Sequence, residues 1–79
     1  MSDTDLAVAQ CLMSVLRHDV GLDELLEHSL AEIGVESWAF TAFLARLEEQ
    51  FGIEWDFDVA AETFDSVRTI AHHLDQVAS

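Results

Sequence analysis

The chain is short and strongly acidic. It has 79 residues, of which 51% are hydrophobic, so the composition predicts a single domain over residues 1–79 with a packed core rather than a disordered acidic tail. Its 16 acidic and 3 basic residues give a formal net charge of −13, which disfavours binding to nucleic acid and to anionic lipid. The same charge favours partners with basic docking surfaces, although the solubility of a small domain explains it equally well.

The cysteine count and the hydropathy pattern narrow the class of protein further. Only one cysteine is present, Cys11, which excludes an intramolecular disulfide framework and a zinc site built from cysteine pairs. No apolar run approaches the roughly 20 residues of a membrane-spanning helix, and the acidic start lacks the pattern of a secretory signal. We therefore expect a cytoplasmic protein that does not bind a membrane.

The first part of the chain predicts a helix followed by a long connection. Apolar residues at helical spacing predict a helix over 4–17, and Asp3 and Thr4 are candidates for its N-cap. Residues 19–36 predict a connection with short helical turns, one of which stops at Gly34. A connection of this length is unusual in a small domain unless it has a function.

The strongest helical pattern covers residues 37–51. Its apolar residues follow the helical period: Phe40, Phe43, Leu44, Leu47 and Phe51. Gly52 stands where a left-handed C-terminal cap is expected, and Ile53 can make the apolar contact that accompanies such a cap.

Residues 53–59 alternate between apolar and polar side chains, which taken alone is typical of a strand. The sequence offers no second strand to pair with this one, and an unpaired strand would leave its backbone groups without partners. We therefore expect an extended connection pinned by Ile53, Trp55 and Phe57, followed by a helical turn at 60–62.

The last segment predicts a helix with Asp65 or Ser66 as its N-cap. Its apolar stripe consists of Val67, Ile70, Ala71, Leu74 and Val77. The expected fold is all-α, a small helical bundle with three main helices, a short third helix and a long first loop. The predicted core consists of Leu12, Leu16, Leu30, Phe43, Leu47, Phe51, Ile70 and Leu74.

Ser37 opens the longest predicted helix and stands between a carboxylate, Glu36, and a large apolar residue, Trp38. At an N-cap its hydroxyl would lie at the surface beside backbone N–H groups, where the helix dipole favours a phosphate. The position therefore suits a serine that carries a phosphodiester. We expect Trp38 to anchor the turn in the core and to hold the hydroxyl outward.

Two motifs in register resemble those of the acyl carrier and peptidyl carrier protein family. Residues 29–38 read SLAEIGVESW and residues 47–53 read LEEQFGI. The family patterns are Ser-Leu-x-x-Leu-Gly-x-Asp-Ser-Leu and Leu-Glu-x-x-Phe-Gly-Ile. The final apolar stripe also falls where the family's last helix falls, so the resemblance spans nearly the whole chain. It implies a carrier-protein-like bundle that is not itself an enzyme.

The resemblance also implies that Ser37 carries 4′-phosphopantetheine, which a phosphopantetheinyl transferase transfers from coenzyme A. The thiol of this arm holds an acyl or aminoacyl group as a thioester. The implied partners are therefore an acyl- or aminoacyl-loading ligase and downstream synthase or transferase enzymes, which act on a monomeric carrier. We predict that the transferase and these partners contact Glu36, Trp38, Thr41, Ala45 and Glu48.

Departures from the family pattern point to a subtype. Glu36 replaces the family's Asp and Trp38 its Leu, and each keeps the chemical type. Fatty-acid carriers usually place acids along the exposed face of this helix, whereas its early positions here include Ala39 and Ala42. This difference favours a freestanding carrier in a polyketide, nonribosomal-peptide or aminoacyl pathway.

The residues alone leave other functions open. Ser37 is equally suited to be a simple N-cap, and the chain would then be a non-modified acidic helical adaptor that binds a partner protein. A nucleic-acid mimic would rest on the net charge alone. The substitution Ser37→Ala separates the first two functions, because it abolishes the function of a carrier and removes only a helix cap from an adaptor.

Three other candidate sites are weaker. The acids between Glu54 and Asp65 have the spacing of a calcium loop, but Val59 stands where its sharp turn needs Gly. His72 and His73 point about 100° apart on a helix, so we expect solvated residues rather than metal ligands. Cys11 lies among apolar residues, and we expect it to be a buried small hydrophobe.

Overall fold

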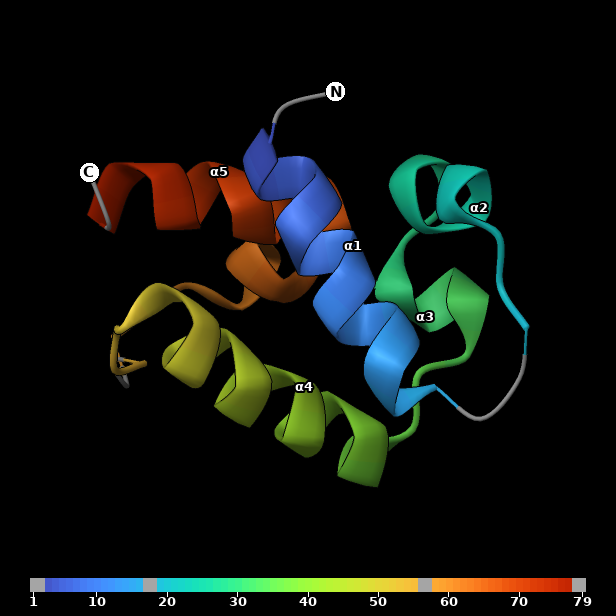
Figure 1. Cartoon of the computed structure of the whole chain (residues 1–79), viewed down its shortest axis with the longest axis horizontal. Coiled ribbons are helices and arrows are strands. Elements are labelled where there is room, and N and C mark those ends of the chain that lie inside the picture. Colours follow the sequence, from blue (N-terminus) through green and yellow to red (C-terminus); the bar gives the residue numbers. More distant parts are fainter. Residues whose placement is uncertain (1–2, 17–18, 56–57, 78–79) are drawn as a thin grey trace.

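Three helices form the frame of the fold, as the sequence predicts. They are α1 (Asp3–Val15), α4 (Ser37–Phe51) and α5 (Val67–Val77). Helix α1 contacts both of the others, and in Figure 1 it passes across α5 and ends near the start of α4. The bounds of α4 are those predicted, whereas α1 ends at Val15, before the predicted end at residue 17. The computed structural model describes residues 3–16, 19–55 and 58–77.

Short helices lie in the connections between these three. Helices α2 (Leu22–Glu27) and α3 (Leu30–Ile33) occupy the long first connection, which confirms the short helical turns expected there. The turn expected at 60–62 is a 3₁₀ helix, η1 (Ala61–Phe64), which packs against α5. Across the described ranges there is no β-strand, and the fold is all-α.

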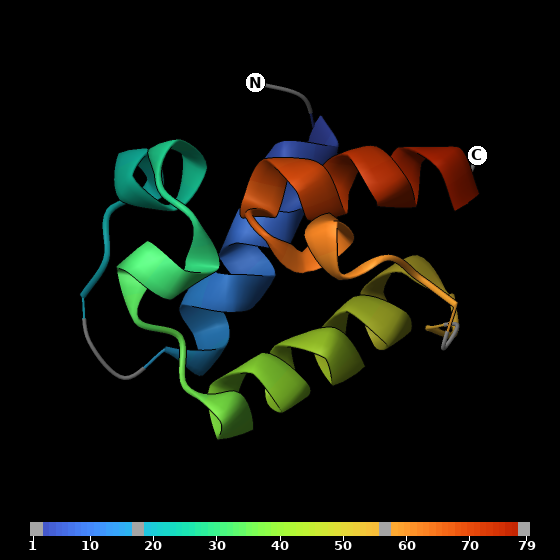
Figure 2. The ribbon, with the colours of Figure 1, turned by 180° about the vertical axis from the view of Figure 1, so that it is seen from behind.

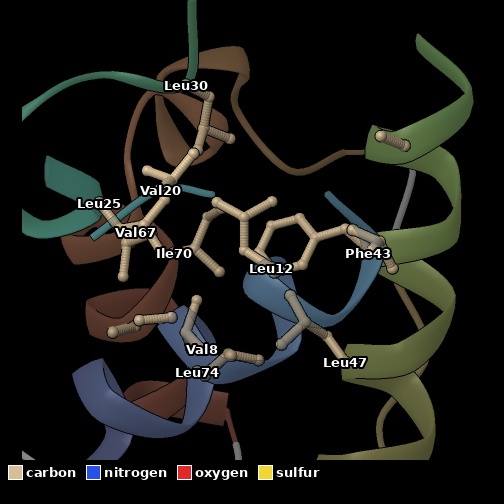
Figure 3. Packing of buried hydrophobic residues seen from close by; sticks show 14 residues of the cluster. Val8, Leu12, Val20, Leu25, Leu30, Phe43, Leu47, Val67, Ile70 and Leu74 are labelled. Carbon is tan, nitrogen blue, oxygen red and sulfur yellow. The ribbon is translucent and has the colours of Figure 1, made fainter. Parts of the chain in front are cut away.

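The hydrophobic core lies where α1, α4 and α5 meet, and residues of α2 and α3 add to it (Figure 3). Six of the eight predicted core residues are buried, whereas Leu16 and Phe51 are partly buried and pack against the core. The end of the predicted stripe on α5 is wrong, because Val77 is 52% exposed. The buried residues are Val8, Ala9, Leu12, Val15, Val20, Leu25, Leu30, Ala39, Phe43, Leu47, Val67, Ile70, Ala71 and Leu74.

Two glycines in the left-handed conformation end the helices α3 and α4. Gly52 has φ 64°, and its backbone N–H, like that of Ile53, donates to the carbonyl of Glu48. This confirms the predicted left-handed cap of α4. Gly34 has φ 86° and ends α3, where it donates to the carbonyls of Leu30 and Ala31. A side chain at either position would meet backbone strain, since L residues rarely adopt these angles.

The connection after α4 is held by Trp55, as predicted. The indole Nε1–H donates to the carbonyl of Leu44 at 3.1 Å, and the Trp55 backbone N–H donates to Glu48 Oε2 at 3.2 Å. The indole packs edge-on against Phe64 and stacks on His73, with ring centroids 5.2 and 5.8 Å apart. Phe57, the third predicted anchor, lies outside the described residues.

The N-termini of α5 and α1 differ in how well the sequence predicts them. Ser66 caps α5, because its hydroxyl accepts from the Thr69 N–H while Thr69 Oγ1 accepts from the Ser66 N–H. The predicted caps of α1 are wrong, since α1 already includes Asp3 and Thr4. The Thr4 hydroxyl instead donates to Asp75 on α5 and so links the two helices. Within the described ranges, no helix has the length and apolar character needed to cross a membrane.

Candidate functional site

The chain reaches the candidate site directly from α3. The αL backbone of Gly34 ends that helix, and the Val35 N–H donates to the Leu30 carbonyl at 3.2 Å. The backbone then turns into α4 within two residues, as Figure 2 shows for the segment between the two helices. Leu30 is buried in the core, so the segment that leads from α3 to Ser37 starts from a fixed residue.

Ser37 is the first residue of α4, and it is exposed. The prediction that it is the N-cap is wrong, because Glu36 occupies that position with an extended backbone (φ −76°, ψ 160°) and no capping hydrogen bond from its side chain. The N-cap is the last extended residue before a helix. In this structure that residue lies one position earlier in the chain than expected. Among the described residues, no group forms a hydrogen bond with the Ser37 hydroxyl.

The side chains of the two neighbours of Ser37 contact each other. Trp38 Nε1–H donates to Glu36 Oε2 at 2.5 Å. The indole is 46% exposed, so the prediction that Trp38 anchors the turn in the core is wrong. The helical period explains this, since Ala39 and Phe43 are the positions of α4 that face the core and Trp38 lies about 100° away from Ala39.

The remaining predicted contact residues differ in their surroundings. Thr41 and Ala45 are exposed and lie three and seven residues after Trp38, on the same face of α4. The Thr41 hydroxyl donates to the carbonyl of Ser37 at 3.0 Å. Glu48 is half-buried, and its carboxylate accepts the Trp55 N–H. The structure therefore places four predicted contact residues on or beside the first three turns of α4, whereas Glu48 holds the following connection.

The first turn of α4 suits a phosphate on Ser37. The positive end of a 15-residue helix dipole favours an anion there, and backbone N–H groups of a first turn point toward it. The carboxylate of Glu36 is turned toward the indole of Trp38. An exposed hydroxyl leaves room for a flexible arm that extends away from the protein.

The structure also places the histidines and the cysteine that the sequence offered as weaker candidate sites. His72 is exposed as expected, but His73 is half-buried against Trp55, a contact that the sequence pattern did not reveal. Cys11 is partly buried, and burial raises the pKa of its thiol while the charge of Arg46 lowers it. In the part of the chain that the structure describes, no three His, Cys, Asp or Glu side chains cluster as metal ligands would.

Comparison with protein families gives one result that covers most of the chain. The model of a family described as a phosphopantetheine attachment site matches residues 7–74. The chain belongs to this family. It is therefore a carrier rather than an enzyme, and it bears covalent 4′-phosphopantetheine, on whose thiol the cargo is held as a thioester. Its partners include a phosphopantetheinyl transferase and synthase enzymes. No curated protein and no solved structure shows significant similarity to the chain.

Proposed function

We propose that Ser37 is the residue to which 4′-phosphopantetheine is attached. The observation that carries this proposal is the exposed hydroxyl at the first residue of α4, which no described residue engages in a hydrogen bond. It lies within the matched residues 7–74. Two other serines at or before helix starts, Ser29 and Ser66, are less suitable because their hydroxyls already accept backbone N–H groups.

The attachment needs no base from this chain. Ser37 Oγ forms a bond to the phosphorus next to the pantetheine of coenzyme A, and the pyrophosphate bond of coenzyme A breaks. Adenosine 3′,5′-bisphosphate leaves with the bridging oxygen, and the hydroxyl proton passes to a base of the transferase. The transferase supplies this base, while the carrier supplies an accessible nucleophile beside a helix N-terminus that favours the resulting phosphodiester.

We further propose a carrier of the polyketide, nonribosomal-peptide or aminoacyl type, which a loading ligase charges in the cytoplasm and which works as a monomer. The exposed face of α4 supports this subtype. Ala39, on which the sequence prediction rested, is buried rather than exposed, since it faces the core. The exposed residues of this face are Trp38, Thr41 and Ala45 rather than a row of acids. An apolar centre surrounded by charge is the usual character of a protein–protein contact surface. The surface that we propose for the partners is Glu36, Trp38, Thr41, Ala45 and Glu48.

The experiment that tests Ser37 is intact-mass measurement after incubation with coenzyme A and a broad-specificity phosphopantetheinyl transferase. The expected result is that the wild type gains one phosphopantetheine and Ser37→Ala gains none. Ser14→Ala is a matched control, since Ser14 is exposed on α1 and, among the described residues, its hydroxyl donates to the Cys11 carbonyl alone. It should be modified like the wild type.

Two outcomes would contradict the proposal. Modification of Ser37→Ala would move the attachment to another residue. A folded wild type that two unrelated transferases both leave unmodified would instead favour the adaptor function. Once the wild type is modified, incubation with loading ligases and a panel of amino and carboxylic acids tests the subtype. Loading of an amino acid would support the aminoacyl type, whereas loading of fatty acids alone would contradict the proposed subtype.

A further inference from the structure

We infer that Glu36 and Trp38 act as a coupled pair that the transferase recognises when it modifies Ser37. This inference rests on the proposed attachment at Ser37 and adds a recognition determinant to it. The pair is visible in one contact, the hydrogen bond at 2.5 Å from the indole Nε1–H of Trp38 to Glu36 Oε2. Ser37 lies between the two residues, so the contact bridges over the attachment position.

The geometry of α4 explains why the bridge forms. Side chains of a helix lean toward its N-terminus, so the indole of the second helical residue lies back over the first turn. There it meets the side chain of the N-cap residue, Glu36. Because Glu36 makes no capping hydrogen bond, its carboxylate is available to accept from the indole. The indole is held while 46% of its surface remains exposed.

The bridge requires both residues in their present form. An Asp at position 36 is shorter by one methylene, or more than about 1 Å, which lengthens the contact beyond the usual limit for this kind of hydrogen bond. A Leu or Phe at position 38 has no N–H to donate. Glu36 and Trp38 are also the two positions at which this chain departs from the Asp-Ser-Leu pattern. The structure therefore explains both departures by one contact.

The bridge presents a negative charge and an apolar ring to a partner in one fixed arrangement. A transferase that binds this surface does not have to order the two side chains, and ordering one mobile side chain weakens binding by about two- to tenfold. Glu36 acts here through Trp38, so it is a positioning residue. A transferase with an apolar pocket wide enough for an indole, beside a cationic side chain, is the partner that this surface fits.

The experiment measures KM and kcat of one transferase for the wild type, Trp38→Phe, Trp38→Leu, Glu36→Asp and the double variant Glu36→Asp/Trp38→Leu. Each single variant should raise KM by about two- to tenfold and change kcat by less than about twofold. In the double variant, the fold increase in KM should be smaller than the product of the fold increases in the two single variants. The reason is that the second substitution removes a group that has already lost its partner. Glu49→Gln removes one exposed charge at the far end of α4 and should match the wild type.

A spectroscopic readout tests the bridge without the transferase. The chain has two Trp residues, and the indole N–H of Trp55 donates to the Leu44 carbonyl far from this site. In a proton–nitrogen correlation spectrum, Glu36→Asp should shift the Trp38 indole signal and leave that of Trp55 unchanged. Trp38→Phe assigns the two signals, and thermal melting shows that each variant is folded.

The outcomes separate this inference from the attachment itself. Unmodified wild type contradicts the attachment at Ser37, and the indole spectra then still test the bridge. If the wild type is modified and the fold increases in KM of the single variants multiply in the double variant, the two residues act independently. That result overturns the inference. An indole signal of Trp38 that does not move in Glu36→Asp overturns it as well.

Discussion

Ser29 and Ser37 stand eight residues apart, and each precedes a large apolar residue at the start of a helix, yet the structure uses them in opposite ways. The Ser29 hydroxyl accepts the Glu32 N–H at 3.2 Å, and the Glu32 carboxylate accepts the Ser29 N–H at 2.9 Å. This capping box closes the first turn of α3. Ser37, in contrast, lies one residue inside α4, and its hydroxyl has no hydrogen-bond partner among the described residues.

The residues that follow the two serines differ in the same way. Leu30 is 6% exposed, whereas Trp38 is 46% exposed. The Leu30 N–H also donates to the Asp65 carbonyl at 2.9 Å, which ties the start of α3 to the segment before α5. The start of α3 is thus built for stability, and the start of α4 leaves a hydroxyl and an indole available for chemistry and for partners.

The largest expected difference between the two regions is in the cost of truncating these apolar residues. Leu30→Ala should lower the free energy of unfolding by about 2–5 kcal/mol, because it leaves a cavity in the core. Trp38→Ala should lower it by less than about 1 kcal/mol, since the indole packs outside the core. Urea denaturation at low temperature measures both. Equal losses would show that Trp38 is a structural anchor and would remove the contrast.

Gly34 separates the two regions, and its backbone gives the next largest effect. Gly34→Ala should destabilise the fold by about 1–2 kcal/mol, because φ 86° is unfavourable for an L residue although no atom lies within 4 Å of the added Cβ. Gly21→Ala is the matched control, since Gly21 has equal space and φ −71°. Because Gly21 is the N-cap of α2, where Ala is less favourable than Gly, Gly21→Ala should lower stability slightly, and by less than Gly34→Ala does. A similar loss in both variants would assign the effect to something other than the left-handed backbone.

The sequence predicts the parts of the fold that follow from periodicity and from strong local signals. The apolar period gives the bounds of α4, and Gly52 marks its end, because a left-handed cap and a 3.6-residue period leave a direct trace in residue order. The alternation at 53–59 is not a strand in its described part, as the lack of a pairing partner already indicated.

The features that the sequence did not predict are the exact first residue of a helix and the contacts between distant segments. Ser is a preferred N-cap residue and Glu is not, so the sequence favours Ser37 as the cap of α4, whereas the structure has Glu36 there. Trp38, expected in the core, is exposed. The stack of His73 on Trp55 and the bond from Thr4 to Asp75 join separate segments. No periodicity within one helix predicts such contacts.

The third prediction compares the two serines directly. Ser29→Ala should lower the free energy of unfolding by about 1 kcal/mol, equivalent to a fall of about 4–8 °C in the melting temperature, because it removes a helix cap. Its modification by the transferase should be unchanged. Ser37→Ala should keep its stability within about 0.5 kcal/mol and lose all modification. Calorimetry and intact mass on both variants check this, and a loss of stability in Ser37→Ala would mean that its hydroxyl also caps α4.

The smallest expected effect is the pH dependence of the capping box. The hydrogen bond from the Ser29 backbone N–H, and then that from its hydroxyl, lowers the pKa of the Glu32 carboxyl. A carboxyl whose pKa is lowered by folding stabilises the folded state fully above its unfolded pKa of about 4.3. This contribution is lost as the pH falls through the lower pKa of the folded state, when both states become protonated.

The difference in unfolding free energy between wild type and Glu32→Gln should therefore be largest above about pH 4.3 and shrink below it. Denaturation across this range measures that difference, with Glu27→Gln as the control for net charge. A difference that does not change with pH would show that the hydrogen bonds of Ser29 do not favour the charged form of Glu32. The bond from the Glu32 backbone N–H to the Ser29 hydroxyl would then be the part of the capping box that distinguishes the start of α3 from that of α4.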